Sequence, residues 1–266
     1  MTTTANDDGP KPATAARIYD YLLGGTHNFP ADRQAAQALI AATPMIPKIA
    51  RANRAFLRRA VRHMVDGGVR QFLDVGSGIP TAGNVHEVAP DARVVYVDID
   101  PVAVAESLDI LEGNDRATAL RADLREPESI LDHPEVRRLV DFDEPVGLLM
   151  VAMLHFLDDD QAYSAVEKLV ATTAPGSFLG ISHGCPNEEL AEVGDLEAAQ
   201  NVMKGRTATA VRPRTRAGIT RFFDGLDLVE PGLVWLPQWR AMPDDPDEFD
   251  GAPALCGVVA GVARRP

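Results

Sequence analysis

Glycines and carboxylates recur along residues 71–123 at spacings that could build a ligand site. Residues 72–75 are apolar apart from Asp74 and lead into Gly76, Ser77 and Gly78, which is typical of a buried strand that ends in a glycine turn before a helix. Glycine has no Cβ, so such a turn lets a ligand approach the backbone. A second run, residues 93–98, ends on Asp98 about 20 residues later, where doubly wound folds hold the hydroxyls of a ribose. Together these features predict an adenosine-type ligand.

A third carboxylate, Asp123, ends the run of residues 118–123. Alone it is typical of a helix cap, the usual role of an Asp before a turn. It gains weight because parallel strands end at one edge of a sheet, where Asp74, Asp98 and Asp123 would meet. Asp74 lies inside its strand, and burial of an unpaired carboxylate is costly. A ligand with a cationic amine or sulfonium would supply the missing charge.

Two histidines follow the next two apolar runs and are candidates for proton transfer. His155 comes after residues 146–153, and His183 comes after residues 177–182. Either could act as a general base near neutral pH, although a single His is more often structural. We rank His183 higher because it ends a strand and precedes a glycine. The sequence has no metal-ligand spacing and no G-x-S-x-G motif, so we expect no metal, and a hydrolase is disfavoured.

Polar and aromatic side chains surround the glycine pair at residues 24–25. The segment either merely covers the sheet or forms a lid whose side chains touch a substrate, since binding groups favour loops on rigid scaffolds. The candidate substrate residues are Tyr19, Tyr21, His27, Asn28 and Phe29. A later group of arginines could recognise a substrate carboxylate, although exposed charge is the commoner explanation. These are Arg206, Arg212, Arg214, Arg216 and Arg221.

The elements that must position these residues alternate between strand and helix over residues 69–186, which predicts a doubly wound α/β fold with a parallel sheet. Two last strands, at residues 226–236 and 254–263, follow each other without a helix and should pair antiparallel. We expect a disordered lead-in over residues 1–12, a helical cap over 13–68 that acts as a lid, and a ligand-binding domain over 69–266.

The composition narrows the class of protein. A net charge of −13 argues against nucleic acid as a partner, because phosphate binding needs a positive surface. Only two cysteines occur, far apart, which is typical of a reducing compartment. No apolar run approaches the roughly 20 residues of a membrane span, and the polar N-terminus lacks a signal sequence. We therefore expect a cytoplasmic protein that does not bind membranes. The oligomeric state is left open.

The motifs resemble those of the S-adenosylmethionine-dependent methyltransferases with a Rossmann-like fold. LDVGSG (73–78), VDIDP (97–101) and RADLREP (121–127) look like their cofactor glycine, ribose and adenine motifs. Over nearly the whole chain, the sequence is also similar to a bacterial S-adenosyl methyltransferase family formerly classed as a domain of unknown function. ARIYDYLLGGTHNFPADRQAA near the N-terminus is the most specific part of that similarity.

The resemblance implies a seven-stranded sheet in the order 3-2-1-4-5-7-6 with strand 7 antiparallel. It also implies S-adenosyl-L-methionine as cofactor and methyl transfer to an O or N atom of an unidentified small molecule. The cofactor contacts would come from Asp74, Gly76, Ser77, Gly78, Asp98, Ile99, Asp123 and Leu124. Two alternatives remain: a non-catalytic binder of the cofactor or of a nucleoside, and an NAD(P)-dependent oxidoreductase. Thr81 argues against the second, because the dinucleotide fingerprint has glycine there.

Overall fold

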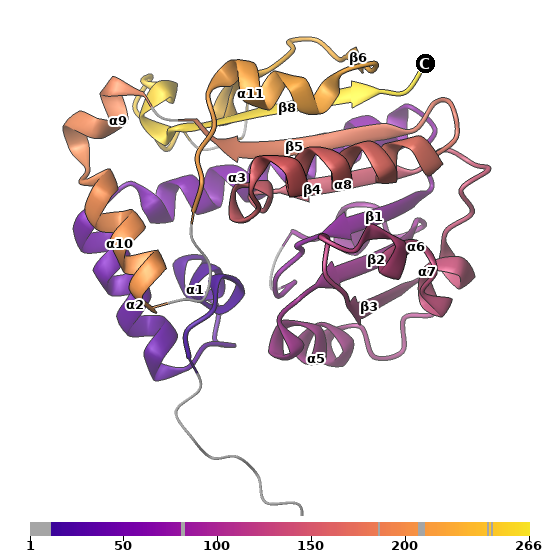
Figure 1. Ribbon diagram of the computed structural model, residues 1–266, viewed down its shortest axis with the longest axis horizontal. Helices are drawn as coiled ribbons and strands as arrows, with labels where there is room; N and C mark the ends of the chain where they lie inside the picture. Colours follow the sequence, from indigo (N-terminus) through magenta and orange to yellow (C-terminus); the bar gives the residue numbers. More distant parts are fainter. Residues whose placement is uncertain (1–11, 81–82, 186, 207–210, 244, 246) are drawn as a thin grey trace, which may run out of the picture.

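A mixed sheet of eight strands forms the middle layer of the molecule, in the order β3-β2-β1-β4-β5-β8-β6, with β7 also paired to β8 (Figure 1). The computed structural model describes residues 12–80, 83–185, 187–206, 211–243, 245 and 247–266. Residues 1–11 of the expected lead-in, and Thr81, lie outside this range. The parallel strands are β1 (Gln71–Val75), β2 (Arg93–Asp98), β3 (Ala117–Arg121), β4 (Gly147–Val151) and β5 (Phe178–Gly184).

The predicted fold is confirmed, with one difference at the C-terminal edge. β8 (Val258–Arg264) runs antiparallel to β5, as expected for the last strand. The strand predicted over residues 226–236 is instead two short strands on β8, β6 (Asp227–Leu228) and β7 (Val234–Trp235). Pro231 and Gly232 lie between them. Proline has no N–H to donate to a ladder and glycine weakens a strand, so the pairing is interrupted there.

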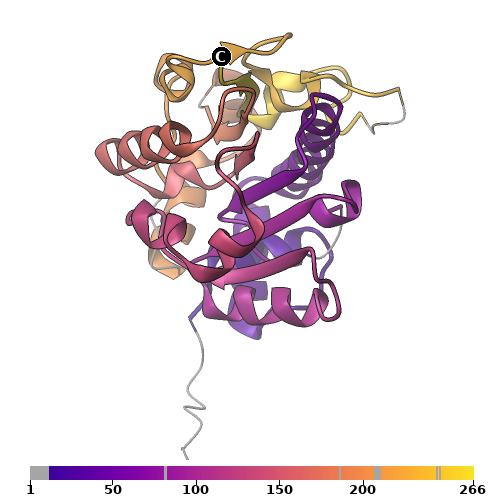
Figure 2. The same ribbon diagram turned by 90° about the vertical axis from the view of Figure 1, so that its right-hand side faces the viewer.

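Long helices cover opposite faces of the sheet (Figure 2). α3 (Ile46–Asp66) packs Phe56 and Met64 against Phe72 of β1 on one face. α8 (Asp159–Thr172) packs against the other face, where Val166 shares a cluster with Leu148 of β4. Apolar residues at helical spacing give each helix one sheet-facing stripe. α3, which we predicted to belong to the cap, is therefore part of the layer that packs on the sheet.

The remaining crossovers are short, and three of their helices begin with a proline, whose fixed φ suits the first helical turn. They are α4 (Val85–Val88), α5 (Pro101–Ile110), α6 (Pro127–Leu131) and α7 (Pro134–Leu139). The described part of the chain also contains α11 (Arg216–Thr220) and four 3₁₀ turns. These are η1 (Leu154–Phe156), η2 (Arg221–Phe223), η3 (Leu236–Gln238) and η4 (Pro253–Cys256).

Helices from two distant parts of the chain form a cap beyond the carboxyl ends of the parallel strands (Figure 1). α1 (Ala15–Leu22) and α2 (Pro30–Ala42) pack with α10 (Leu196–Arg206) around a small apolar core that includes Ile18 and Met203. The helix predicted over residues 187–203 is divided into α9 (Glu188–Val193) and α10 at Gly194. None of the described helices is long and apolar enough to cross a membrane.

Candidate active site

The glycine turn after β1 has a backbone that only glycine adopts without strain. The φ angles of Gly76 and Gly78 are +71° and +63°, in the left-handed region. A Cβ built on Gly76 would lie 2.6 Å from the Cβ of Met153, so the position has no room for a side chain. Gly78 is more open, since the nearest atom to a Cβ placed there would be the Cβ of Ala16, at 4.0 Å. α1 of the cap therefore lies directly over this turn.

Asp98 joins the turn to the end of β2. Its Oδ2 accepts a hydrogen bond from the Gly78 N–H at 2.8 Å, and its Oδ1 accepts one from the Asp100 N–H, also at 2.8 Å. Each carboxylate oxygen can accept a further bond, so the group can still bind two hydroxyls. Burial raises the pKa of Asp98, and its backbone hydrogen bonds oppose that rise. Beside it, Ile99 is 51% exposed and offers an apolar surface suited to a planar ring.

Asp74 is buried in β1 at the foot of the turn, with 5% of its surface exposed. Burial raises its pKa to about 7, the charge of Asp98 adds to the rise, and the Arg54 guanidinium opposes it. Arg54 also donates a hydrogen bond to the side-chain oxygen of Asn84. A cationic ligand group near Asp74 would restore its ionised form, because an opposite charge lowers the pKa of a carboxyl.

The third predicted carboxylate lies beside this edge and has a partner of its own. The Ala122 N–H donates to the carbonyl oxygen of Asp98 at 3.1 Å, which places the turn after β3 next to Asp98. Arg125 holds the Asp123 carboxylate through its Nε at 2.9 Å, and this hydrogen bond lowers the pKa of Asp123. Leu124 is buried, so its backbone amide and not its side chain is the candidate contact. The structure thus brings the three predicted carboxylates to one edge.

His183 lies in the interior, on the α8 side of the sheet, contrary to our expectation that it faces an acceptor. Its side chain has no exposed surface. Nδ1 is 2.8 Å from the carbonyl oxygen of Gly184, and Nε2 is 2.8 Å from an Nη of Arg214. Burial lowers the pKa of His183 to about 4. Because both ring nitrogens have partners, these contacts contradict its higher rank as the general base.

Arg214 is a buried clamp, which differs from the solvated surface favoured for the arginine group. It also donates to the carbonyl oxygens of Leu154 and Leu157 at 2.9 and 3.0 Å, and it pairs with Asp159 at 2.9 Å. Arg216 and Arg221 lie over the rings of Trp235 and Tyr163, respectively. Arg214, Arg216 and Arg221 therefore contact the protein itself, whereas the Arg212 side chain is exposed as predicted. Arg214 fixes η1 against the end of β5.

His155 is a better placed candidate than His183. It lies in η1, directly after β4, and its ring centroid is 5.5 Å from that of His183. Its Nδ1 is buried and has no hydrogen-bond partner among the described residues. Burial, followed by the charges of His183 and Arg214, lowers the pKa of His155 to about 3. At neutral pH the ring is therefore uncharged, and its buried Nδ1 has an unused hydrogen-bonding capacity.

The five predicted substrate residues do not converge on one point. The Tyr19 hydroxyl donates to the Ala50 carbonyl oxygen at 3.1 Å, and Tyr21 packs within the cap. His27 pairs with Glu106 of α5 at 2.5 Å. Asn28 binds within its own loop, and Phe29 lies beneath the Arg17 guanidinium. Of this set, Tyr19 contacts α3, and Tyr21 packs on the same apolar cluster as Phe156 of η1.

Several polar residues that we did not predict are buried at this edge. Asn53 donates to the Tyr19 hydroxyl at 3.0 Å and accepts from the Ser182 hydroxyl at 2.5 Å. Ser182 in turn accepts from the N–H of Ala152, a non-glycine residue at φ +56°. Strained backbone of this kind is concentrated at functional sites. Asn53 looks like one more polar residue of an amphipathic helix, and only its position on the apolar stripe of α3 signals burial.

The cap is attached to the segment after β2 by one buried ion pair and a hydrogen bond. Arg17 binds Asp32 at 2.9 Å and Asp100 at 3.1 Å, and the hydroxyl of Thr14 donates to Asp100 at 2.5 Å. Because the Asp100 N–H also donates to Asp98, the cap and the Asp98 carboxylate share one hydrogen-bonded network.

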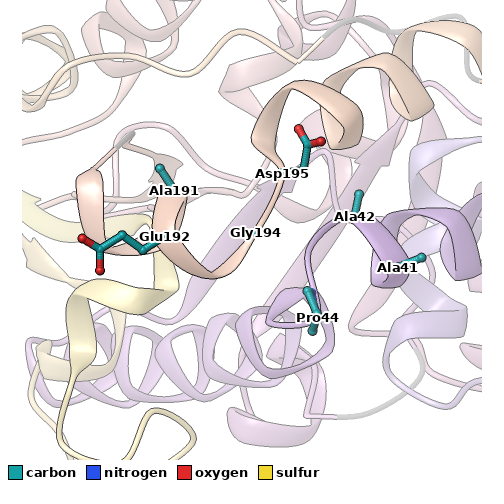
Figure 3. Close-up of a pocket in the computed structure, with 7 residues that line it drawn as sticks. All are labelled: Ala41, Ala42, Pro44, Ala191, Glu192, Gly194 and Asp195. Atoms are coloured by element: carbon teal, nitrogen blue, oxygen red, sulfur yellow. The ribbon is translucent and has the colours of Figure 1, made fainter.

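A hollow elsewhere in the cap does not belong to this arrangement (Figure 3). It lies where the link between α9 and α10 meets the end of α2, and the Asp195 N–H donates there to the Ala42 carbonyl oxygen at 2.7 Å. It is open to solvent and contains none of the predicted site residues. Its lining is Ala41, Ala42, Pro44, Ala191, Glu192, Gly194 and Asp195.

Comparison with protein families identifies the chain. The family model described as S-adenosyl methyltransferase matches residues 3–266. The chain belongs to this family. It is accordingly an enzyme that uses S-adenosylmethionine. Gly78 leaves open space above the turn and Asp98 binds the turn directly, an arrangement that is compatible with a cationic cofactor. In the part of the chain that the structure describes, no cluster of residues suits a metal ion.

Solved structures agree with the family assignment. The methyltransferase is 38% identical to a protein of Thermobifida fusca YX assigned as a methyltransferase, with 97% of this chain and 96% of the other covered and a TM-score of 0.87. A DUF574 family protein from Streptomyces avermitilis MA-4680 is also 38% identical, with coverage of 96% and 98% and a TM-score of 0.84. Magnesium protoporphyrin IX methyltransferase from Synechocystis PCC 6803, solved with S-adenosylhomocysteine, shares the fold at 14% identity, coverage of 94% and 98% and a TM-score of 0.54. Comparison with curated proteins gave no match.

Proposed function

We propose that this methyltransferase methylates an O or N atom of a small molecule held between α1, η1 and α10. The observation that carries the proposal is that Tyr21, Phe156 and Met203, one from each of these elements, contribute to one apolar cluster. Phe156 also packs against the main core beneath the sheet. It therefore lies at the junction of the cap with the sheet edge, and its neighbour His155 has a buried ring nitrogen without a hydrogen-bond partner among the described residues.

The cofactor would be held at the sheet edge by residues of three strand ends. When bound, S-adenosylmethionine supplies a methyl group on a positively charged sulfur. Asp98 would accept the two ribose hydroxyls, and Ile99 would cover a face of the adenine. Asp123 would accept the adenine amino hydrogen, and the Leu124 amide would donate to the ring. Asp74, at the foot of the turn through Gly76, Ser77 and Gly78, would face the amino-acid end.

His155 would act on the acceptor mainly by orienting it. A base is most effective when its pKa is near the working pH, and the pKa of His155 is lowered to about 3. The neutral ring can still accept a hydrogen bond from a hydroxyl or amine of the acceptor. This bond would orient the lone pair of the acceptor atom toward the methyl group. Such positioning accounts for a large part of catalysis in displacement reactions.

The cap favours a small acceptor over a macromolecule. α1 lies over the glycine turn, and Arg17 binds it to Asp100 through a buried ion pair. A folded protein or a duplex could not reach past such a cover without its opening. The net charge of −13 also disfavours nucleic acid. The apolar cluster suits an acceptor with an apolar body and one polar reactive group.

The test is transfer of a labelled methyl group from S-adenosylmethionine into extracts separated by size. We expect label in the small-molecule fraction with the wild-type chain, loss of it with Asp98→Ala, and strong reduction with His155→Ala at unchanged affinity for S-adenosylhomocysteine. Label found only in protein or nucleic acid would refute a small acceptor. Tight cofactor binding with no labelled product in any fraction would favour the non-catalytic binder instead.

A further inference from the structure

Asp20, on α1, is a buried carboxylate that has no cationic partner among the described residues. It is 2% exposed. Its Oδ2 accepts a hydrogen bond from the Asn28 side-chain amide at 2.8 Å, and its Oδ1 has no hydrogen-bond partner. Arg33, a cation in this network, donates to Asn28 and not to Asp20.

A buried carboxylate of this kind lowers the stability of the folded protein. Burial of an ionised carboxylate is strongly unfavourable unless a cation or several donors compensate it. The other buried carboxylates of the cap network are compensated, since Asp32 and Asp100 both bind Arg17. The unpaired oxygen of Asp20 therefore indicates a positive group that belongs to a ligand.

The position of Asp20 on the helix points to the cofactor. Residues four apart lie on the same face of a helix, so Asp20 follows Ala16 on the face that lies over Gly78. The loop after α1 closes around the carboxylate next to its unpaired oxygen. A Cβ on Gly25 would lie 2.0 Å from Oδ1, so the loop can approach only because residue 25 is glycine.

We infer that Asp20 faces the sulfonium of the bound cofactor and makes the enzyme prefer S-adenosylmethionine over S-adenosylhomocysteine. The cofactor has two cationic centres, an ammonium and a sulfonium. Two buried carboxylates of this edge, Asp74 and Asp20, form no direct ion pair among the described residues, although the Arg54 guanidinium acts on Asp74 from a distance. Asp74, at the foot of the glycine turn, suits the amino-acid end. Asp20, above the turn on the cap, is left for the sulfur.

This arrangement would help the reaction cycle at its last step. Once the methyl group has left, the sulfur is neutral, and Asp20 again lacks a counter-charge under the cap. The product is thereby less well bound than the substrate, which favours its release. The inference rests on the family's cofactor and is independent of the proposed acceptor.

The experiment compares the two ligands by calorimetry in the wild-type chain and in Asp20→Asn, which keeps the shape and removes the charge. We expect affinity for S-adenosylmethionine to fall roughly tenfold or more, as for loss of a charge-assisted contact, and affinity for S-adenosylhomocysteine to change by less than about twofold. Asp227→Asn, an exposed carboxylate on β6, is the matched control for net charge and should change neither affinity.

Two readouts separate this inference from a structural role and from failure of the cofactor assignment. Without ligand, Asp20→Asn should melt at or above the wild-type temperature, because an uncompensated charge has been removed; a lower melting temperature with unchanged affinities would overturn the inference. Equal loss of affinity for both ligands would place Asp20 at the ammonium and also overturn the inference.

If Asp20→Asn does not fold, a measurement on the wild-type chain decides. The wild-type chain should bind an analogue with a protonated amine in place of the sulfonium more tightly than it binds the neutral product. If the wild-type chain binds neither cofactor form, the cofactor assignment itself fails.

Discussion

The backbone N–H of Gly78 donates a hydrogen bond of 2.8 Å to Oδ2 of Asp98, twenty residues further along the chain. This bond connects the two loops that would hold the amino-acid end and the ribose of the cofactor. The other oxygen of Asp98 binds the N–H of Asp100, and Arg17 of the cap binds the Asp100 side chain. A continuous series of hydrogen bonds and an ion pair therefore connects the glycine turn, Asp98 and the cap.

Replacement of Asp98 should abolish cofactor binding. Asp98→Ala removes the acceptor for two ribose hydroxyls and leaves the N–H groups of Gly78 and Asp100 without their partner. Loss of two hydrogen bonds to a charged group predicts a fall in affinity of roughly 100-fold or more. Calorimetry with S-adenosylhomocysteine measures it, with Asp227→Ala as the exposed control. Near wild-type affinity in a folded Asp98→Ala protein would contradict the assignment.

A methyl group on Gly76 should destabilise the turn more than one on Gly113. Both glycines have positive φ, +71° and +80°, so alanine is strained at each. Only Gly76 has a neighbour in the way, since a Cβ there would lie 2.6 Å from Met153 and one on Gly113 would meet no atom within 4 Å. We expect Gly76→Ala to lower the free energy of unfolding by about 1–3 kcal/mol more than Gly113→Ala. Equal effects in denaturant titrations would show that the turn relaxes freely.

Loss of Arg17 should loosen the cap. Arg17→Met leaves Asp32 and Asp100 buried without their cation, for which a cost of about 3–5 kcal/mol is typical. Amide exchange over residues 13–42 should speed up, and cofactor affinity should fall because Asp100 positions Asp98. Arg137→Met breaks the exposed pair with Asp132 and should have almost no effect. Unchanged exchange in Arg17→Met would refute the coupling.

The pKa of Asp74 predicts an effect of pH on the ligand-free protein. In the folded protein this pKa is raised from 3.8 to about 7. The native state then binds more protons than the unfolded state between these values, so the contribution of Asp74 to stability declines as the pH rises toward 7. Asp74→Asn should therefore be more stable than the wild type at pH 8, by up to about 4 kcal/mol, and similar to it near pH 4. A constant difference across this range in melting or denaturant curves would disprove the linkage.

His183 predicts the opposite trend in acid. Its folded pKa is lowered from 6.5 to about 4. The unfolded state binds more protons within this window, so His183 destabilises the protein as the pH falls from 6.5 to 4, by up to about 3 kcal/mol. His183→Gln should flatten this part of the stability curve relative to the wild type. An identical slope in urea titrations at pH 7, 6 and 5 would show that His183 titrates normally.

Local patterns were sufficient to predict the sheet and the edge at which Asp74, Asp98 and Asp123 meet. An apolar run that ends in Gly76, a second that ends in Asp98 and a third that ends near Asp123 are recognisable without tertiary contacts. The rule that parallel strands end at one edge then predicts that they meet. The division of the strand over residues 226–236 was also readable, because Pro231 lies inside it.

The roles of the polar residues depended on contacts far apart in the sequence. His183 lies two and four residues after Ile181 and Leu179, on the same face of β5. Strand periodicity could therefore have signalled that it faces the core. The partner of its second ring nitrogen is Arg214, thirty-one residues away, and no local pattern indicates this contact. Arg17 and Asp20 look like the polar face of a solvated helix until Asp32, Asp100 and the loop at Gly25 surround them. The sequence by itself determined which residues end the strands, because that depends on period and turn chemistry; only the tertiary structure decided which charges are buried and which lack a partner, because burial depends on what the rest of the chain places beside them.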